Sequence, residues 1–97
     1  MTTLFHSIAS TNDTALNARG LLAMSRAIRG FDPLGALDLE SYAYTEAEQA
    51  GYEDGKAGHE MSLQFVGEET LCRGWRSGYE LAIELNQPVE WGAPEFI

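Results

Sequence analysis

The sequence predicts a small α+β domain, mainly helical, with about three helices and short edge strands. In three stretches the apolar residues recur at helical spacing, and in a few shorter segments apolar and polar residues alternate as in a strand. Glycine or proline separates these stretches and segments. At 97 residues, 44% of them hydrophobic, the chain suffices for one domain with a modest core. We therefore expect residues 1–97 to form a single domain.

The first third of the chain predicts a short strand followed by a helix. Residues 4–9 alternate loosely between apolar and polar types, which favours the strand. Residues 11–13 are all good N-cap types, and small or apolar residues then share one helical face. Gly30 stands where a C-terminal cap is expected. The first helix is therefore predicted over residues 13–29.

The middle of the chain predicts a loop and then a second helix. Residues 31–44 contain Asp-Pro, a glycine and mixed polarity, which is typical of an ordered loop or a short irregular element. Thr45 and Glu48 have the spacing of a capping box, so the helix is predicted to begin there. Gly58 is expected to end it.

The last third predicts one more strand and a third helix. Residues 61–65 alternate and are expected to form an edge strand. Two glutamates at 68–69 suit the first turn of a helix that runs to about Leu85, and Pro88 prevents much continuation. Residues 89–91 are expected either to pair as a short strand or simply to pack.

Charge divides the chain unevenly. Residues 1–30 contain one acid, Asp13, and three arginines, whereas residues 31–97 contain fourteen acids and only three basic residues. The second stretch therefore carries −11, and the whole chain −9. A small domain needs a net charge of only about 2 to 8 in magnitude to stay in solution. The excess predicts a cationic partner and repulsion from nucleic acid and anionic membranes.

Little in the sequence indicates catalysis. Cys72 is the only cysteine, so the chain has no internal disulfide and no cysteine-based zinc site, which suits a reducing cytoplasm. His6 and His59 are far apart and lie outside any H-E-x-x-H pattern, and neither G-x-S-x-G nor a P-loop occurs. The first residues do not resemble a signal peptide, and no apolar run approaches about 18 residues. We expect no enzyme, no cofactor and no metal.

Two glycine-aromatic patterns stand out in the second and third predicted helices. They are Gly51-Tyr52-x-x-Gly55 and Gly74-Trp75-x-x-Gly78-Tyr79. A helical glycine costs about 1 kcal/mol relative to alanine, so such pairs need a reason. Glycines four residues apart let another backbone approach closely. The pattern predicts a tightly packed helix pair, with a ligand surface as the alternative.

This part of the chain, roughly residues 46–83, resembles the ribosome modulation factor family. The matching residues in the two helices are Ala47, Gly51, Tyr52, Gly55, Ala57, Gly58, Gly74, Trp75, Gly78 and Ala82. The resemblance implies two helices joined by a loop. That family is basic and binds ribosomal RNA, whereas this segment is acidic, and RNA affinity rests mainly on Lys and Arg. A ribosome-associated modulator is therefore the alternative function.

The whole chain is similar, in length and acidity, to the small phage anti-CRISPR proteins that inhibit type I-F CRISPR-Cas complexes. Its opening residues Met1-Thr2-Thr3, Phe5, Ser7-Ile8 and Thr11-Asn12 also resemble the start of one acidic member of that group. The resemblance implies a monomeric inhibitor that mimics double-stranded DNA in the cytoplasm of the host bacterial cell. Its carboxylates would occupy the positively charged groove of the surveillance complex's large subunit. A generic acidic phage adaptor without mimicry is a further possibility.

The candidate partner-binding residues are the carboxylates without an evident cation nearby. Glu69 with Arg73, and Arg76 with Glu80, have the spacing of ordinary i,i+4 surface pairs, which would neutralise them. The remaining candidates are Asp32, Asp38, Glu40, Glu46, Glu48, Glu53, Asp54 and Glu60. Glu46, Glu53 and Asp54 are expected to project to one side of the second predicted helix, two turns apart. Any acidic helix shows such spacing, so an ordinary charged surface is the competing interpretation.

Overall fold

The structure, a computed structural model, describes the backbone of residues 2–86 and the side chains of residues 13–86. Its elements are α1 (Thr2–Ile28), α2 (Pro33–Ala57), the 3₁₀ turn η1 (Leu63–Phe65) and α3 (Glu69–Leu85). Residues 2–86 contain no strand, so the predicted α+β class is wrong and the fold is all-helical. Within the same residues, no helix is long and apolar enough to cross a membrane.

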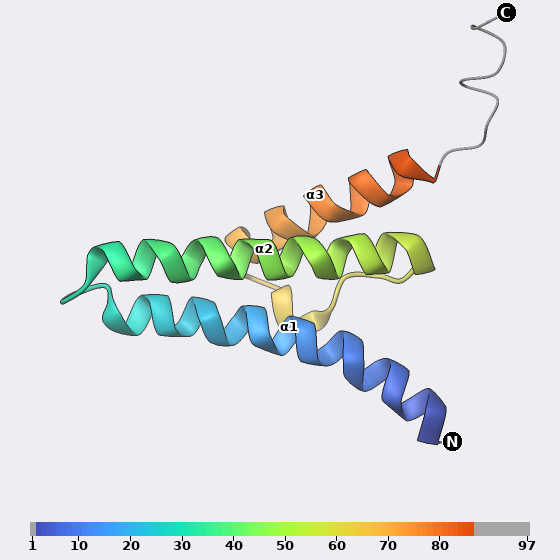
Figure 1. The fold of residues 1–97 in the computed structure, drawn as a ribbon, viewed down its shortest axis with the longest axis horizontal. Helices are drawn as coiled ribbons and strands as arrows, with labels where there is room; N and C mark the ends of the chain where they lie inside the picture. The colour runs from blue at the N-terminus through green and yellow to red at the C-terminus, as the bar shows by residue number, and fades with distance from the viewer. Residues whose placement is uncertain (1, 87–97) are drawn as a thin grey trace, which may run out of the picture.

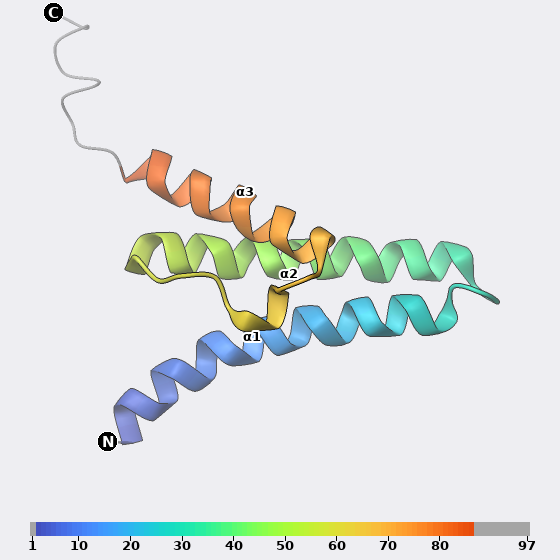
Figure 2. The same cartoon turned by 180° about the vertical axis from the view of Figure 1, so that it is seen from behind.

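α2 is the central element of the fold. α1 and α2 run antiparallel as a hairpin, and α3 packs on another side of α2 (Figure 1). The connection from α2 to α3 runs back across the hairpin and places η1 against α1 (Figure 2). α1 and α3 hardly touch each other, so α2 and η1 hold them together.

α2 begins about twelve residues earlier than the sequence predicted. Asp32 is its N-cap and accepts a hydrogen bond from the Gly35 backbone N–H at 3.0 Å, and proline occupies the first helical position, where its missing N–H is harmless. The predicted loop over 31–44 is therefore mostly helix. Thr45 is not a cap, because its hydroxyl donates to the Ser41 carbonyl 3.1 Å away inside the helix. The predicted end is confirmed, with Gly58 in the left-handed region at φ 76°.

Both predicted strands that fall in the described part of the chain are wrong. Residues 4–9 belong to α1, which also runs through the expected N-caps at 11–13 and ends at Ile28, close to the predicted end. A short alternating run has no strand to pair with here, so helix satisfies its backbone. Residues 61–65 lead into η1, where the Ser62 side chain accepts from the Gln64 N–H at 3.1 Å.

The third helix is confirmed nearly to the residue. α3 runs from Glu69 to Leu85, and its end is capped by Asn86, whose side-chain amide donates to the Ala82 carbonyl at 2.7 Å. The short strand considered for residues 89–91 lies outside the described residues.

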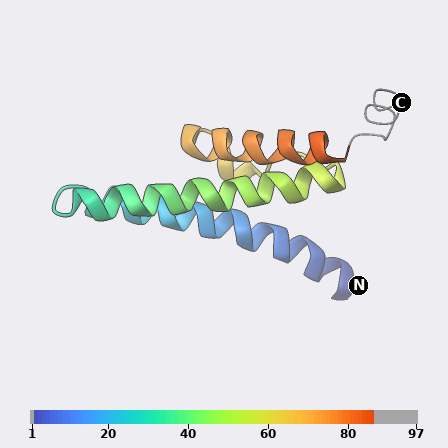
Figure 3. The ribbon, with the colours of Figure 1, turned by 45° about the horizontal axis from the view of Figure 1, so that its top comes forward.

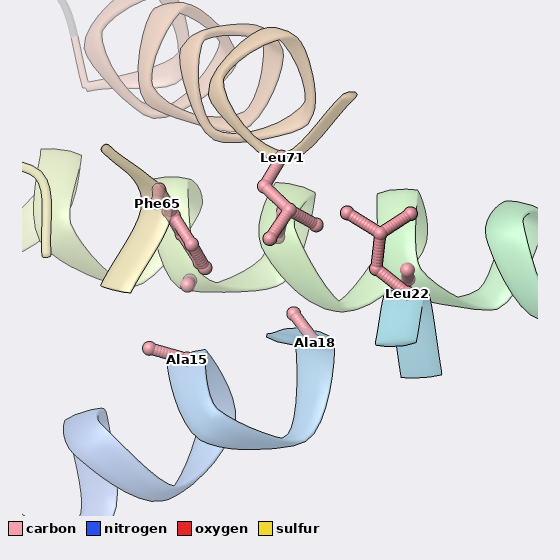
Figure 4. Packing of buried hydrophobic residues seen from close by; sticks show 8 residues of the cluster. Ala15, Ala18, Leu22, Phe65 and Leu71 are labelled. Carbon is pink, nitrogen blue, oxygen red and sulfur yellow. The ribbon is translucent and has the colours of Figure 1, made fainter. Parts of the chain in front are cut away.

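The core is built largely from alanine. Figure 4 shows Phe65 and Leu71 reaching from the η1–α3 side toward Ala15 and Ala18 of α1. The buried cluster consists of Ala15, Ala18, Leu22, Ala43, Ala47, Ala50, Phe65 and Leu71. Since alanine buries little area, the helices gain stability by approaching closely, and the two large side chains fill the space that remains.

The α2–α3 contact is the close crossing that the glycine pairs predicted. A Cβ added at Gly51 would collide with the Trp75 carbonyl, and one added at Gly78 would collide with the Glu48 carbonyl. At Gly55 an added Cβ would lie 2.8 Å from the Cβ of Ala82. The packing prediction is thus confirmed. Figure 3 shows α3 lying over α2 along this contact.

Candidate acidic binding surface

The three arginines in α1 and directly after it contact other parts of the molecule. Arg19 donates to the Gln64 carbonyl of η1 at 2.8 Å, and Arg26 forms a two-point contact with Glu68 at 2.5 and 3.3 Å. Arg29 lies 3.5 Å from Glu40 of α2. The uneven charge of the sequence therefore has a structural role, because the basic helix is tied to acidic neighbours and to a backbone carbonyl.

The Arg26–Glu68 pair changes the titration of both groups. The hydrogen bond from Arg26 to Glu68, with the attraction of opposite charges, lowers the pKa of Glu68 and raises that of Arg26. The side chain of Glu68 is largely covered while that of Arg26 is mostly in solvent. This pair links α1 to the start of α3 through charge, where few apolar groups are available.

Four of the eight predicted carboxylates have internal hydrogen-bond partners, and three of these four, Asp32, Glu40 and Glu48, remain at least partly exposed. Asp32 caps α2, as described above. Glu40 pairs with Arg29 and also accepts from the Thr70 hydroxyl at 3.3 Å. Glu48 accepts from the Ser77 hydroxyl at 3.1 Å, across the α2–α3 contact. These groups help to position the helices, so their charge is only partly available to a partner.

Asp54 faces into the molecule. The residue is 2% exposed, and its carboxylate accepts from the indole N–H of Trp75 at 2.9 Å. The His59 Nδ1 lies 3.8 Å from its other carboxylate oxygen. The sequence grouped Asp54 with Glu46 and Glu53 on one outward side, but the α3 contact turns it inward. Asp54 is therefore a structural group and not part of a binding surface.

The remaining four predicted acids, Asp38, Glu46, Glu53 and Glu60, form no ion pair with any side chain in residues 13–86. Asp38, Glu53 and Glu60 are exposed, and Glu46 is half-buried. Helical spacing places Asp38, Glu46 and Glu53 along one side of α2, about 12 and 10 Å apart at 1.5 Å per residue. Glu60 follows the end of the helix.

Asp13 of α1 joins this surface, although the sequence did not suggest it. Asp13 and Glu46 line one shallow hollow of about 500 Å³ between α1 and α2, together with Thr14, Leu16 and Asn17. We name Asp13, Asp38, Glu46 and Glu53 the acidic face. Asp13 was missed because it lies in the basic third of the sequence. Only the antiparallel pairing of α1 with α2 brings it beside Glu46.

The two predicted i,i+4 pairs on α3 do not form ion pairs. Every ion pair found among the described side chains involves Arg26, Arg29 or His59. The prediction for Arg73 and Arg76 was therefore wrong. Both arginines are exposed, so they present positive charge on the surface of α3.

No part of the described chain has the geometry of a metal site. Side chains of residues 13–86 contain no group of three or more His, Cys, Asp or Glu placed to hold a metal ion. Cys72 is half-buried and its thiol donates to the Phe65 carbonyl at 3.1 Å, which makes it a packing residue.

Comparison with known proteins does not assign the chain. No model of a known family matches it, and neither does any curated protein or any solved structure.

Proposed function

We propose that the chain is a phage-encoded inhibitor of a type I-F CRISPR surveillance complex. It acts in the host bacterial cytoplasm as a mimic of double-stranded DNA, by occupying the positively charged groove of the large subunit. The observation that supports this proposal is the acidic face, whose four carboxylates have no ion-pair partner among the described side chains. The three arginines of residues 1–30 are engaged elsewhere, with Gln64, Glu68 and Glu40.

The mimicry is coarse. Duplex DNA carries one charge per about 1.7 Å of its axis, whereas carboxylates on α2 of the acidic face are about 10–12 Å apart. A partner groove would therefore not meet a carboxylate at each phosphate position. Affinity would come mainly from the local field of the acidic face, with contacts from both helices of the hairpin, and the net charge of −9 would chiefly speed the encounter with the groove.

The mechanism requires no chemistry. The inhibitor blocks the groove sterically and displaces duplex by competing for the same Lys and Arg side chains. Because those contacts are exposed charges, the association rate and affinity should fall with added salt.

The test is a competition assay on the purified surveillance complex with labelled target duplex. The variant Asp38→Lys/Glu46→Lys/Glu53→Lys reverses three charges of the acidic face and is expected to lose competition. Its matched control, Glu69→Lys/Glu80→Lys/Glu84→Lys, makes the same change in net charge on α3 and should retain most of it. Simultaneous binding of duplex and protein, or full competition by the first variant, would refute the mimic.

A second function is favoured by one specific observation. Residues 46–83 contain two helices joined by a loop, which is the arrangement that the ribosome modulation factor resemblance implies, and these two helices cross at glycines. Co-sedimentation with purified ribosomes tests this candidate. Saturable binding to ribosomes, without binding to the surveillance complex, would replace the first proposal by the second.

A further inference from the structure

One end of the helical hairpin projects beyond the rest of the molecule. α3 begins opposite the middle of α2, where Thr70 contacts Glu40 and Gly74 packs on the Tyr44 carbonyl. Figure 1 shows that the α1–α2 turn and the first turns of α2 extend past this point without a third helix over them. We name residues 30–39 the arm.

The arm is held firmly in place. The backbone N–H groups of Phe31 and Asp32 both donate to the Ile28 carbonyl, at 3.1 and 2.7 Å. The buried hydroxyl of Ser25 donates to the Ala36 carbonyl at 2.7 Å, which ties α1 to α2 at this end. Together with the Asp32 cap, these bonds order the backbone of the arm and so fix the positions from which its side chains project.

This fixed arm presents large apolar side chains to solvent. Phe31 is 78% exposed, Leu34 76% and Leu37 55%. Leu34 and Leu37 are neighbours on the helix surface at i,i+3 spacing. A turn between helices is ordinarily polar, and a cluster of exposed apolar groups on a rigid element is typical of an interaction site.

Opposite charges border the two sides of this apolar cluster. Leu37 lines a shallow hollow of about 280 Å³ that also includes Glu40 and, from α3, Arg73. Because Glu40 is paired with Arg29, Arg73 is the charge in this hollow that has no ion-pair partner among the described side chains. Asp38 lies on the other side, next to Leu34 at i,i+4 spacing. Asp38 and Arg73 are both exposed, and neither forms an ion pair with a described side chain. Across this surface, Arg73 therefore lies on one side of the apolar cluster and Asp38 on the other.

We infer that the arm docks on the arm of a second copy of this chain. A two-fold axis parallel to α2 brings the apolar clusters together and reverses the order of the charges. Arg73 of each copy then faces Asp38 of the other, giving two ion pairs around an apolar centre. The inference does not depend on the proposed function, because the arm shares only Asp38 with the acidic face.

The dimer should be weak. Stable interfaces bury about 800 Å² per partner, and three apolar side chains bordered by two charges supply less than that. Association should therefore appear only at high protein concentration. It should weaken with salt, since exposed ion pairs contribute to it.

The test is sedimentation velocity of the full chain over a concentration series. The wild type should sediment faster as concentration rises. Asp38→Arg and Arg73→Asp, each alone, should weaken association by about tenfold, as two attractive contacts become repulsive. The double variant Asp38→Arg/Arg73→Asp should restore it. Leu34→Ser should also weaken it, whereas Leu63→Ser, at an 85% exposed position on η1, is the matched control and should not.

Three outcomes would overturn the inference. If the wild type stays monomeric at every concentration, the arm does not bind a second copy of the chain. A dimer whose single charge variants are not rescued by the double variant contradicts the paired charges. Equal losses from Leu34→Ser and Leu63→Ser place the contact elsewhere. Circular dichroism of each variant shows that a loss of association is not a loss of folding.

Discussion

At the scale of residues, two adjacent acidic residues on α2 lie in opposite environments. Glu53 is exposed, whereas Asp54 is buried against the indole of Trp75. A rotation of 100° per residue around the helix separates the two environments. The sequence could not distinguish them, because the position of α3 relative to α2 decides which of the two is covered.

Removing the Asp54 carboxylate should destabilise the fold. In Asp54→Ala the indole N–H of Trp75 loses its acceptor, and leaving a covered donor unpaired costs about 1–3 kcal/mol. Chemical denaturation followed by tryptophan fluorescence measures the effect. Glu53→Ala is the matched control and should change stability by less than about 0.5 kcal/mol. Equal unfolding midpoints for the two variants would contradict the structural role of Asp54.

Glu68 should give the fold a specific sensitivity to acid. The hydrogen bond from Arg26 lowers its pKa below the ordinary value of 4.5, so the folded state binds this proton less readily than the unfolded chain does. The resulting stability is complete above the unfolded pKa and is lost as pH falls through the lower, folded pKa. Glu68→Gln should therefore be less stable than wild type near neutral pH, with the difference shrinking below about pH 4.5. Thermal melts over this range, with Glu69→Gln as control, test the expectation. A difference that does not vary with pH would contradict it.

At the scale of elements, local signals predicted the helix ends better than the beginnings. Gly58 and Gly30 indicated helix ends because the residue after a helix often adopts a left-handed backbone, which glycine does most easily. Gly58 has this conformation in the structure. The beginning of α2 was missed because Asp32-Pro33 is typical of both a turn and a helix N-terminus. Thr45 suggested a false beginning because a threonine inside a helix can bond to its own backbone.

Glycines on α2, α3 and α1 should respond in opposite ways to alanine. Gly51→Ala and Gly78→Ala place a Cβ against a backbone carbonyl of the facing helix, so each should cost at least about 1–3 kcal/mol. Gly20→Ala meets nothing within 4 Å on α1 and should stabilise by about 0.5–1 kcal/mol through helix propensity. Urea unfolding of the three variants measures these differences. If Gly78→Ala were as stable as Gly20→Ala, the close crossing would be wrong.

At the scale of the whole molecule, the sequence predicted the excess negative charge but not its arrangement. Among the candidates, Asp38 and Glu53 are exposed and Glu46 is half-buried. Tertiary packing buries Asp54, which was a predicted site residue, and brings Asp13, which was not, beside Glu46. Charge counts follow from composition, whereas neighbours across a helix pair depend on register, which local patterns do not encode.

The purified protein should bind neither duplex DNA nor ribosomal RNA at physiological salt. A chain carrying −9 repels phosphates, and the α1 arginines that could oppose this are engaged with their own neighbours. Fluorescence anisotropy with labelled duplex and labelled ribosomal RNA is the measurement. Micromolar affinity for either would refute the electrostatic account of the protein and favour the ribosomal alternative.

The central position of α2 also has a consequence for how the molecule opens. Because α1 and α3 each pack mainly on α2, and meet each other only through the shared core around Leu71 and the Arg26–Glu68 pair, either outer helix can open while most contacts of the other stay in place. Amide hydrogen exchange should then show two partial openings, one that exposes α1 and another that exposes α3. The amides of α2 would exchange only when the whole chain unfolds. In this chain the first helix and the last would exchange independently, and the middle one would report the global stability.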